Sequence, residues 1–248
     1  MPQRHVVVTG GGRGVGAATA RRFKEMGDRV TLMARSRVEI ERLADEIGAY
    51  SVRADVSDPA SVEAAFMAAG PVDILVNNAG IVRIGLLTKT DVRVWEEHLK
   101  VNLTGAFLCS LKVLPGMISR GRGVIVNVAG IAGLQGVPYL GAYTASKHGL
   151  IGLTRAMAAE IAGQGVNVNA ICPSFVETST LSSVAAQIAE KAGKSTEDVL
   201  GSFRERHPEN RLLDAREVAD AIAYLASDEA RELHGAVVVL DEGQVRAV

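Results

Sequence analysis

Short apolar runs rich in valine and isoleucine alternate along the chain with longer segments in which apolar residues recur at helical spacing. Several short runs, such as 74–76 and 124–126, are apolar at every position, which is typical of strands covered by helices on both faces. The predicted strands are 5–9, 29–34, 50–55, 74–77, 123–128, 167–171 and 236–240. Helices are predicted near 15–27, 37–48, 59–69, 91–120, 142–163 and 215–227. This order predicts an α/β fold with a doubly wound parallel sheet, whose ligands bind outside the carboxyl ends of the strands.

The sequence shows no linker, repeat or low-complexity segment between these elements. At 248 residues the chain is longer than most single domains, yet α/β folds of this size often remain undivided. We therefore expect a single domain over residues 1–248. Residues 177–213 depart from the alternation, because they are polar and helix-prone and precede the last helix. Long insertions of this kind often cover active sites, so this segment is predicted to be a substrate lid.

Charge and composition argue against several classes of function. A formal net charge of −1 gives no general attraction to nucleic acid or to anionic membranes. No uncharged apolar run reaches about 18 residues, and no secretory leader is recognisable, so we expect a cytoplasmic protein that does not span a membrane. Cys109 and Cys172 lie in apolar segments without metal-ligand spacing. Two reduced, buried thiols and no metal site are therefore expected.

A glycine-rich segment, Thr-Gly-Gly-Gly-Arg-Gly-Val-Gly at 9–16, follows the first predicted strand and opens the first predicted helix. Glycine permits a tight turn and lets backbone N–H groups approach phosphates, and the helix N-terminus adds partial positive charge. In this strand–turn–helix context the segment predicts a Rossmann-type site for a nicotinamide dinucleotide. The predicted contacts come from Gly10, Gly12, Arg13, Gly14, Val15 and Gly16.

The end of the second predicted strand indicates which dinucleotide is bound. NAD-specific Rossmann proteins place an acidic residue there to hold the ribose 2′-hydroxyl, but this chain has Ala34. Arg35 follows, and Arg13 can reach the same group from the glycine turn. Guanidinium groups bind a 2′-phosphate that a carboxylate would repel. With Ser36 beside them, these arginines predict NADP(H), whereas Arg37 is either a further contact or a solvated surface charge.

Further motifs follow in order: Asp55-Val56, Asn77-Asn78-Ala79-Gly80, Val101-Asn102-Leu103-Thr104-Gly105, Tyr143-Thr144-Ala145-Ser146-Lys147 and Pro173-Ser174-Phe175-Val176-Glu177-Thr178. Together with the glycine turn, they resemble the motifs of the short-chain dehydrogenase/reductase (SDR) family over nearly the whole chain. The resemblance implies a nicotinamide-dependent oxidoreductase with Tyr143, Lys147 and Asn102 as catalytic residues. It also implies cofactor contacts from Asp55, Val56, Asn78, Ala79, Gly80, Tyr143, Lys147, Val176 and Thr178.

Tyr143 and Lys147 carry the predicted chemistry. They lie four residues apart on a predicted helix and so point to one side of it. A phenol normally titrates at about 10, but a neighbouring ammonium and the positive nicotinamide lower that pKa toward the working range. Tyr143 would then exchange a proton with the substrate oxygen, while hydride moves between the substrate carbon and the nicotinamide. The resemblance implies that Lys147 also holds the nicotinamide ribose and that Asn102 helps bind a water linking Lys147 to solvent.

One position departs from the family pattern. The family's catalytic serine lies thirteen residues before the tyrosine, and here that position is Gly130. Losing a donor to the substrate oxygen can reduce the rate on the order of a hundred- to a thousandfold. Three explanations are open: another hydroxyl such as Ser174, or a water, replaces the serine; the glycine was introduced to inactivate the enzyme; or the chain binds its cofactor without turnover.

The substrate pocket is expected to be largely apolar. It is predicted from 81–87, 133–140 and the lid, with Val82, Leu134, Val137, Pro138, Leu140, Phe175 and Leu181 as candidate contacts and Gln135 as a polar one. Leu140 lies three residues before Tyr143, where SDR enzymes for small carboxylates have a basic residue, which favours an apolar ketone or a longer acyl thioester. Many of these side chains could instead simply pack the lid.

The predicted helices 91–120 and 142–163 are apolar on more than one face, which suggests subunit contacts. The family resemblance implies a homotetramer, with a dimer as the alternative. The last strand ends Leu240-Asp241-Glu242-Gly243, and Glu242 replaces a glycine that usually contributes to packing and assembly.

Two functions are consistent with these features of the sequence. The first is an NADP(H)-dependent reductase or dehydrogenase that interconverts a carbonyl, in a ketone or 3-oxoacyl thioester, and a secondary alcohol. The second is a catalytically weak NADP(H)-binding protein, which the glycine at position 130 would explain.

Overall fold

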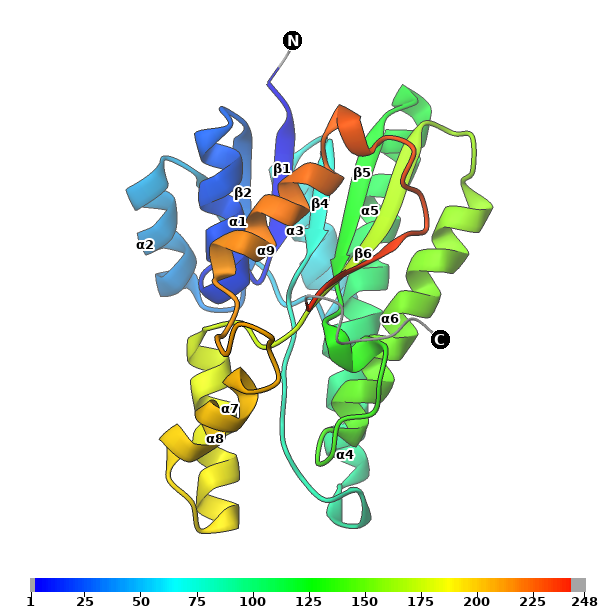
Figure 1. Ribbon diagram of the computed structural model, residues 1–248. Coiled ribbons are helices and arrows are strands. Elements are labelled where there is room, and N and C mark those ends of the chain that lie inside the picture. The colour runs from blue at the N-terminus through cyan, green and yellow to red at the C-terminus, as the bar shows by residue number, and fades with distance from the viewer. Residues whose placement is uncertain (1–2, 242–248) are drawn as a thin grey trace.

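A computed structural model describes residues 3–241 and shows a parallel sheet at its centre (Figure 1). Over these residues the sheet has seven strands in the order β3-β2-β1-β4-β5-β6-β7, and every adjacent pair is parallel. The strands are β1 His5–Thr9, β2 Arg29–Ala34, β3 Tyr50–Arg53, β4 Ile74–Asn77, β5 Gly123–Val128, β6 Val166–Pro173 and β7 Val237–Leu240. The predicted doubly wound α/β fold is confirmed. Glu242, singled out in the sequence, lies outside the described residues.

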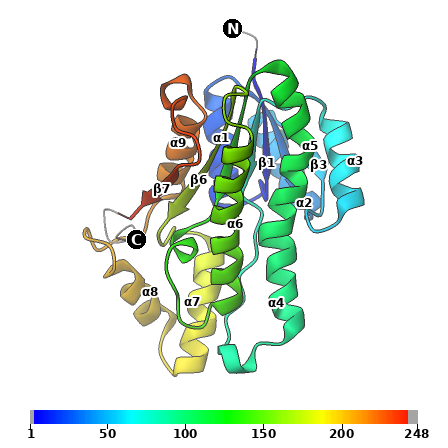
Figure 2. The same cartoon turned by 90° about the vertical axis from the view of Figure 1, so that its right-hand side faces the viewer.

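Helices cover both faces of this sheet (Figures 1 and 2). One face carries α1 Gly14–Glu25, α2 Arg37–Ile47 and α9 Ala215–Leu225. The other carries α3 Pro59–Ala69, α5 Gly105–Arg120 and α6 Gly141–Glu160. α4 Val92–Leu99 precedes α5 in the chain, lies beyond the carboxyl ends of the strands and packs against α6 (Figure 2). Short 3-10 helices are η1 Leu87–Lys89, η3 Ile131–Gly133 and η4 Asp228–Ala230, and η2 Lys100–Thr104 is a π-helical segment.

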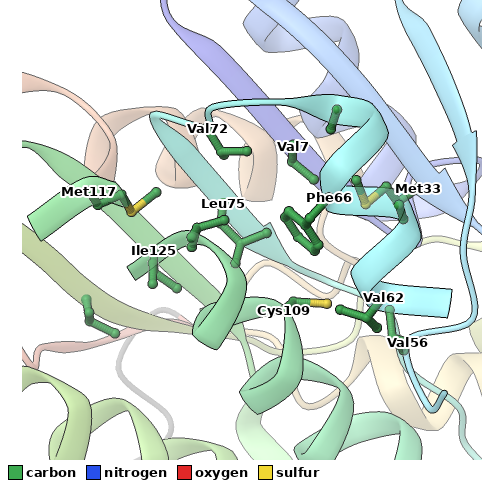
Figure 3. Packing of buried hydrophobic residues seen from close by; sticks show 14 of the residues in the cluster. Val7, Met33, Val56, Val62, Phe66, Val72, Leu75, Cys109, Met117 and Ile125 are labelled. Atoms are coloured by element: carbon green, nitrogen blue, oxygen red, sulfur yellow. The ribbon is translucent and has the colours of Figure 1, made fainter. Parts of the chain in front are cut away.

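The alternation of side chains along β1 shows why the strands are apolar at every position. Val7 packs into the cluster beneath α3 and α5, whereas Val6 and Val8 pack into the cluster beneath α1, α2 and α9. Figure 3 shows the first cluster, in which Phe66 of α3 faces Val7 and Leu75 of the sheet. Both faces of the sheet are therefore buried, as the sequence predicted.

Two predicted strands end at other residues in the structure, and in each case the neighbouring strands explain the difference. The strand predicted at 50–55 ends at Arg53, because β3 is an edge strand whose ladder with β2 ends at the pair Ala34 and Arg53. The strand predicted at 167–171 runs from Val166 to Pro173, because β6 pairs with a strand on each side. Pattern alone does not reveal how many neighbours a strand has.

The long helix predicted at 91–120 is continuous from Val92 to Arg120 but contains the π-helical segment Lys100–Thr104. Among residues 3–241 it is the one helix whose length and composition would allow it to cross a membrane, although the sequence predicted no such span. Its buried residues, such as Cys109, Val113 and Met117, pack into the core beneath the sheet. These contacts make its second half part of the core.

The segment predicted as a lid forms two helices, α7 Ser179–Ala192 and α8 Thr196–Arg204. Both lie beyond the carboxyl ends of the strands (Figure 1). They pack on each other through their own small apolar cluster of Ala185, Ala189 and Val199.

Buried side-chain amides join the two central strands to the helices. The Asn77 amide donates to the Asn127 carbonyl oxygen at 2.9 Å, and the Asn127 amide donates to the Thr154 hydroxyl of α6 at 2.8 Å. All three side chains are buried, so each bond replaces water that cannot reach these groups. The network links β4, β5 and α6 just before the loop that contains Gly130.

We expect Asn127→Ala to lower the free energy of unfolding by about 1–3 kcal/mol, because it removes the partner of two buried groups. Asn167→Ala is the matched control, since the Asn167 amide donates to the Arg231 carbonyl at the surface, 2.7 Å away. Its expected cost is below about 1 kcal/mol. Urea unfolding of both variants tests this, and equal losses would contradict a special role for the buried network.

Candidate active site

The glycine turn is held by a very close contact between α1 and the end of β1. A Cβ atom added to Gly16 would lie 2.3 Å from the Gly10 carbonyl oxygen, so only glycine fits there. Gly10 and Gly14 have φ values of +63° and +52°, which favour glycine. The Gly10 N–H donates to the Met33 carbonyl of β2 at 2.7 Å. The N-terminus of α1 is thereby fixed against the ends of β1 and β2.

Asn78 braces this turn from the neighbouring strand. Its side-chain amide donates to the carbonyl oxygens of Thr9 and Gly10, at 3.0 and 3.1 Å. In return, the Thr9 hydroxyl accepts from the N–H groups of Asn78 and Ala79, each at 3.1 Å. Asn78 was predicted as a cofactor contact, and the structure also gives its side chain a supporting role that the sequence did not indicate.

One cavity of about 800 Å³ runs from the glycine turn past Tyr143 to the lid helices. Its size suits a dinucleotide and a small substrate together. Most predicted cofactor residues line it: Gly10, Gly12, Arg13, Gly14, Val15, Arg35, Ser36, Asp55, Val56, Asn78, Ala79, Gly80, Tyr143, Lys147, Val176 and Thr178. Gly16 and Asn102, also predicted as site residues, do not line it. The glycine cradle and the helix N-terminus that faces the cavity fit a bound pyrophosphate.

Arg13, Arg35 and Ser36 lie at the end of the cavity beside β2 and α2. Arg37 does not line the cavity, and its guanidinium instead pairs with Glu41 at 2.6 Å. This supports the second of the two interpretations of Arg37, a solvated surface charge. Glu39 also lines the cavity, and sequence reasoning missed it. Two guanidinium groups and one carboxylate therefore surround the place predicted for a 2′-phosphate.

Asp55 and Val56, which come just after β3 in the chain, form part of the cavity wall. The Asp55 carboxylate accepts from the Ser57 N–H at 2.9 Å and from its hydroxyl at 2.7 Å. Burial opposes ionisation of this carboxyl, yet the hydrogen bonds from Ser57 outweigh it and hold the pKa of Asp55 below its ordinary value. The carboxylate is therefore ionised and fixed in orientation.

Tyr143 and Lys147 lie on one side of α6, as their spacing predicted, and both line the cavity. The Lys147 ammonium is 5.6 Å from the centre of the Tyr143 ring and donates to the Val128 carbonyl of β5 at 2.8 Å. The pKa of the Tyr143 phenol was predicted to be lowered by its cationic neighbours, but burial raises it to about 12. Burial also lowers the pKa of Lys147 to about 8. At neutral pH the phenol is therefore a proton donor beside a cation.

Asn102 lies in the π-helical segment, a local geometry that is frequent at functional sites. Its side-chain amide donates to the Ile81 carbonyl and to the Ser146 hydroxyl, both at 3.0 Å, and its oxygen accepts from the Ile81 N–H at 2.8 Å. Asn102 therefore fixes the chain after β4 against α6. Gly80 lies between Asn102 and the Lys147 ammonium, since a Cβ added to it would lie 3.4 Å and 3.6 Å from them.

His98 is a buried residue of the site that the sequence analysis missed. Its ring meets the Tyr143 ring edge to face, with centroids 6.5 Å apart. His98 Nδ1 is 2.7 Å from the Val94 carbonyl oxygen and Nε2 accepts from the Arg83 N–H at 3.1 Å. These bonds place the tautomer with its proton on Nδ1 and attach the chain after β4 to α4. The i, i+4 spacing of His98 and Asn102 on the predicted helix was the available signal.

Gly130 faces the Tyr143 phenol and has a backbone conformation that favours glycine. Its φ is +84° and its ψ is 165°. A Cβ added there would meet only ordinary contacts, the Pro173 carbonyl oxygen at 3.6 Å and the Tyr143 hydroxyl at 3.9 Å. There is space for a side chain beside the phenol, but the backbone disfavours any residue except glycine.

The segment predicted as a lid begins beside the glycine turn in space, because Thr178 lies against Gly14. Thr178 caps α7 by accepting from the Leu181 N–H at 3.2 Å, and a Cβ on Gly14 would lie 3.3 Å from the Thr178 methyl group. At its far end α7 reaches across to the chain after β4, where the Lys191 ammonium donates to the Ile84 carbonyl at 3.2 Å. The segment predicted as a lid therefore contacts both walls of the cavity.

The candidate substrate contacts are largely brought together. Val82, Val137, Pro138, Leu140, Phe175 and Leu181 line the cavity. Leu134 instead packs into the core beneath α6, and Gln135 lines a smaller neighbouring cavity. Tyr139 also lines the main cavity and was missed, although its φ of +66° is unusual for a tyrosine. Its carbonyl accepts from the Gly85 N–H at 2.9 Å, which joins the two loops that flank the pocket.

Cys109 and Cys172 are free, buried thiols, as predicted. Burial raises the pKa of each to about 12, so both are protonated at neutral pH. Within residues 3–241, no group of three or more histidine, cysteine, aspartate or glutamate side chains is arranged to hold a metal ion.

The arrangement matches known proteins in sequence and in structure. The family model for short chain dehydrogenases matches residues 4–189. A 2-(R)-hydroxypropyl-CoM dehydrogenase of Xanthobacter autotrophicus is 38% identical over 96% of this chain and 97% of its own. From the same organism, an inactive 2-(S)-hydroxypropyl-CoM dehydrogenase 2 is 38% identical over 90% of this chain and 98% of its own.

Among solved structures, a single-residue variant of actinorhodin polyketide ketoreductase with NADPH superposes with a TM-score of 0.92. It is 35% identical, and the match covers 98% of this chain and 97% of that one. The glycine turn, the Tyr143–Lys147 pair and these matches over nearly the full length agree with one another. The chain belongs to the short-chain dehydrogenase/reductase family of nicotinamide-dependent oxidoreductases.

Proposed function

We propose that this protein is an NADP(H)-dependent oxidoreductase that interconverts a carbonyl, in a ketone or 3-oxoacyl thioester, and a secondary alcohol. One observation carries the proposal: a single cavity joins the glycine turn, with Arg13 and Arg35, to the Tyr143–Lys147 pair. The cofactor and the reacting carbon can therefore meet in one cavity. The related ketoreductase with NADPH supports the same cofactor and reaction type.

In the proposed reaction the bound nicotinamide supplies or accepts the hydride. Tyr143 donates its phenolic proton to the carbonyl oxygen during reduction and takes it back during oxidation. Lys147 stabilises the phenolate that this transfer leaves, and its ammonium also reaches the ribose hydroxyls. Asn102 positions Gly80 and α6 through its bonds to Ile81 and Ser146, so that the ammonium is held beside the phenol.

The preference for NADP(H) is proposed from the charges beside α2. Arg13 and Arg35 line the cavity where a 2′-phosphate would lie, and Ala34 leaves room beside them. Glu39 opposes this preference, since a carboxylate repels a phosphate and would accept from a ribose hydroxyl. Two guanidinium groups outweigh one carboxylate because Arg–phosphate bonds are charge-assisted and often bidentate.

Gly130 leaves the Tyr143 phenol without a serine hydroxyl beside it. Ser174 is a candidate replacement, because it lines the cavity directly after Pro173, whose carbonyl lies beside Gly130. A water in the space beside Gly130 could donate to the substrate oxygen in the same way. Either donor would keep the reaction possible at a reduced rate.

The second candidate function is NADP(H) binding with little or no turnover. The observation that favours it is again Gly130, whose backbone is set in a conformation that serine rarely adopts. A relative that is itself described as an inactive dehydrogenase is consistent with a loss of activity. Measured turnover distinguishes the two functions.

The proposed setting is a cytoplasmic homotetramer, or a homodimer. Exposed apolar residues on the outer side of the long helix support an assembly, since Trp95, Phe107 and Leu111 are 38%, 41% and 47% exposed. The substrate is proposed to be a small molecule, and neither nucleic acid nor a membrane is proposed as a partner.

Arg35→Ala is expected to raise the Kd for NADPH by about tenfold or more and to change the Kd for NADH little, because it removes a charge-assisted bond to the 2′-phosphate. Arg37→Ala is the matched control, since Arg37 pairs with Glu41 outside the cavity. Glu39→Gln should shift the preference further toward NADPH. Fluorescence titration with each dinucleotide tests this, and tighter binding of NADH by the unaltered protein would overturn the NADP(H) assignment.

The pH dependence follows from the two pKa values at the site. Lys147, with a pKa of about 8, is charged below that pH and neutral above it. Carbonyl reduction should therefore slow above this pKa, because the phenolate formed by Tyr143 loses its neighbouring cation. The Lys147→Met variant should reduce carbonyls more slowly at every pH, and its rate should not show this decrease above about pH 8. Alcohol oxidation should rise with pH, because the ionised fraction of Tyr143 increases as the pH approaches the pKa of its phenol, about 12.

Tyr143→Phe should abolish turnover in both directions while NADPH fluorescence still reports binding. Steady-state rates across pH, in each direction, provide the measurement. A phenylalanine variant with rates close to those of the unaltered protein would rule out Tyr143 as the proton donor.

Gly130→Ser tests the enzyme proposal directly. The added hydroxyl would lie beside the Tyr143 phenol and should raise the rate on the order of a hundredfold. The positive φ should cost roughly 1–3 kcal/mol of stability. Gly136→Ser is the control, because its Cβ would have no neighbour within 4 Å.

NADPH absorbance is followed over a panel of ketones and 3-oxoacyl thioesters for all three proteins. If neither the glycine nor the serine protein oxidises NADPH with any carbonyl, the enzyme proposal fails. If only the serine protein does so, the second candidate function is correct.

A further inference from the structure

A smaller polar cavity of about 100 Å³ adjoins the substrate end of the main one. Five residues line both cavities: Ile131, Ser174, Phe175, Phe203 and Arg206. The polar residues of the smaller cavity are Gln135, Ser174, Arg206, His207, Arg211 and Asp241. Two guanidinium groups and an imidazole therefore face one carboxylate, in contrast to the apolar lining next to Tyr143.

Arg206 differs from the other arginines of the lid region. Arg204 pairs with Glu197 at 2.6 Å, and Arg211 pairs with Glu217 at 2.7 Å. No carboxylate within residues 3–241 forms an ion pair with Arg206, although the side chain lines both cavities. Its charge is therefore available to a ligand in the cavity.

The Phe175 ring contacts this guanidinium and is itself stacked on Phe203. Phe175 stacks on Phe203 of α8 with ring centroids 4.5 Å apart and an angle of 5° between the planes. The Arg206 guanidinium lies over the Phe175 ring, 5.7 Å from its centre. A cation–π contact orients the guanidinium without neutralising its charge. The planar fork can then bind an anionic oxygen pair on its free edge.

We propose that Arg206 forms a subsite for an anionic group of the substrate, at a distance from the carbonyl that reacts at Tyr143. The inference rests on the proposed function and names its substrate class: ketones or 3-oxoacyl thioesters with an apolar spacer and a remote carboxylate or phosphate. Leu181, Val184 and Ile188 of α7 provide the apolar surface of the cavity along the spacer.

The residues around the carbonyl end exclude the short keto acids from this class. Val137, Pro138 and Leu140 line that part of the cavity, and all three side chains are apolar. A carboxylate directly beside the reacting carbonyl would lose its hydration against apolar side chains. The same group at the end of a spacer meets Arg206 instead. Asp198 and Lys194 also line the cavity, and because their charges are opposite, together they favour neither an anionic nor a cationic substrate group.

The kinetic test compares 7-oxooctanoate with its methyl ester, with NADPH as reductant. We expect the unaltered protein to have the lower KM for the carboxylate. Arg206→Gln should raise that KM by roughly tenfold to a hundredfold, while kcat and the KM for the ester stay within about twofold. Arg204→Gln is the matched control, because it removes a nearby guanidinium, at the end of α8, that is already paired, and it should change neither KM.

A second pair of substrates separates the two sources of the anion. Acetoacetyl-coenzyme A carries phosphates, whereas the N-acetylcysteamine thioester of acetoacetate has the same acyl group without them. If Arg206→Gln raises the KM only for the coenzyme A thioester, the subsite binds a phosphate. If it raises the KM only for 7-oxooctanoate, the subsite binds a carboxylate.

Binding measured by calorimetry separates this inference from the proposed function. Octanoate, but not 1-octanol, should bind the protein saturated with NADP⁺, and Arg206→Gln should weaken its binding about tenfold or more. If octanoate binds in this way but no carbonyl is reduced, the proposed function fails and the subsite stands. If carbonyls are reduced but Arg206→Gln changes neither octanoate binding nor the two KM ratios, the subsite is overturned.

Discussion

The contact between Gly16 and the Gly10 carbonyl oxygen is the constraint on which the rest of the site depends. It sets α1 against the end of β1 more closely than any side chain would allow. Asn78 holds both Thr9 and Gly10, so the same contact fixes the end of β4. From there the chain passes to Gly80, which lies against the Lys147 ammonium and Asn102. The binding end and the catalytic end of the cavity are thus linked by a few residues after two adjacent strands.

The fold and much of the site could be predicted because they depend on local sequence patterns. The all-apolar strands, the glycine turn and the spacing of Tyr143 and Lys147 each follow from a periodicity or a turn chemistry. Four strands, β1, β2, β4 and β5, have the predicted bounds. The ends of β3 and β6 could not be predicted, because they depend on how many strands lie beside them.

The parts that escaped prediction are contacts between segments far apart in the sequence. Glu39 reaches the cavity because α2 packs over the glycine turn, and His98 reaches Tyr143 because α4 packs against α6. The sequence marked Gly130 only by the absence of a hydroxyl. Its positive φ is set by the loop between β5 and η3, and no local pattern predicts that value. The same is true of Arg206, whose position depends on the stacked pair Phe175 and Phe203.

The π-helical segment Lys100–Thr104 changes the phase of the long helix between its two halves. One wider turn holds an extra residue relative to an α-helix, so α4 and α5 present their buried faces about 100° apart from where a regular helix would place them. Val92–Leu99 can then face α6 while Gly105–Arg120 faces the sheet. A homologue that lacked one residue here would keep its sequence motif yet rotate the Asn102 side chain out of the site. The length of this helix is therefore as informative about function as the identity of the asparagine.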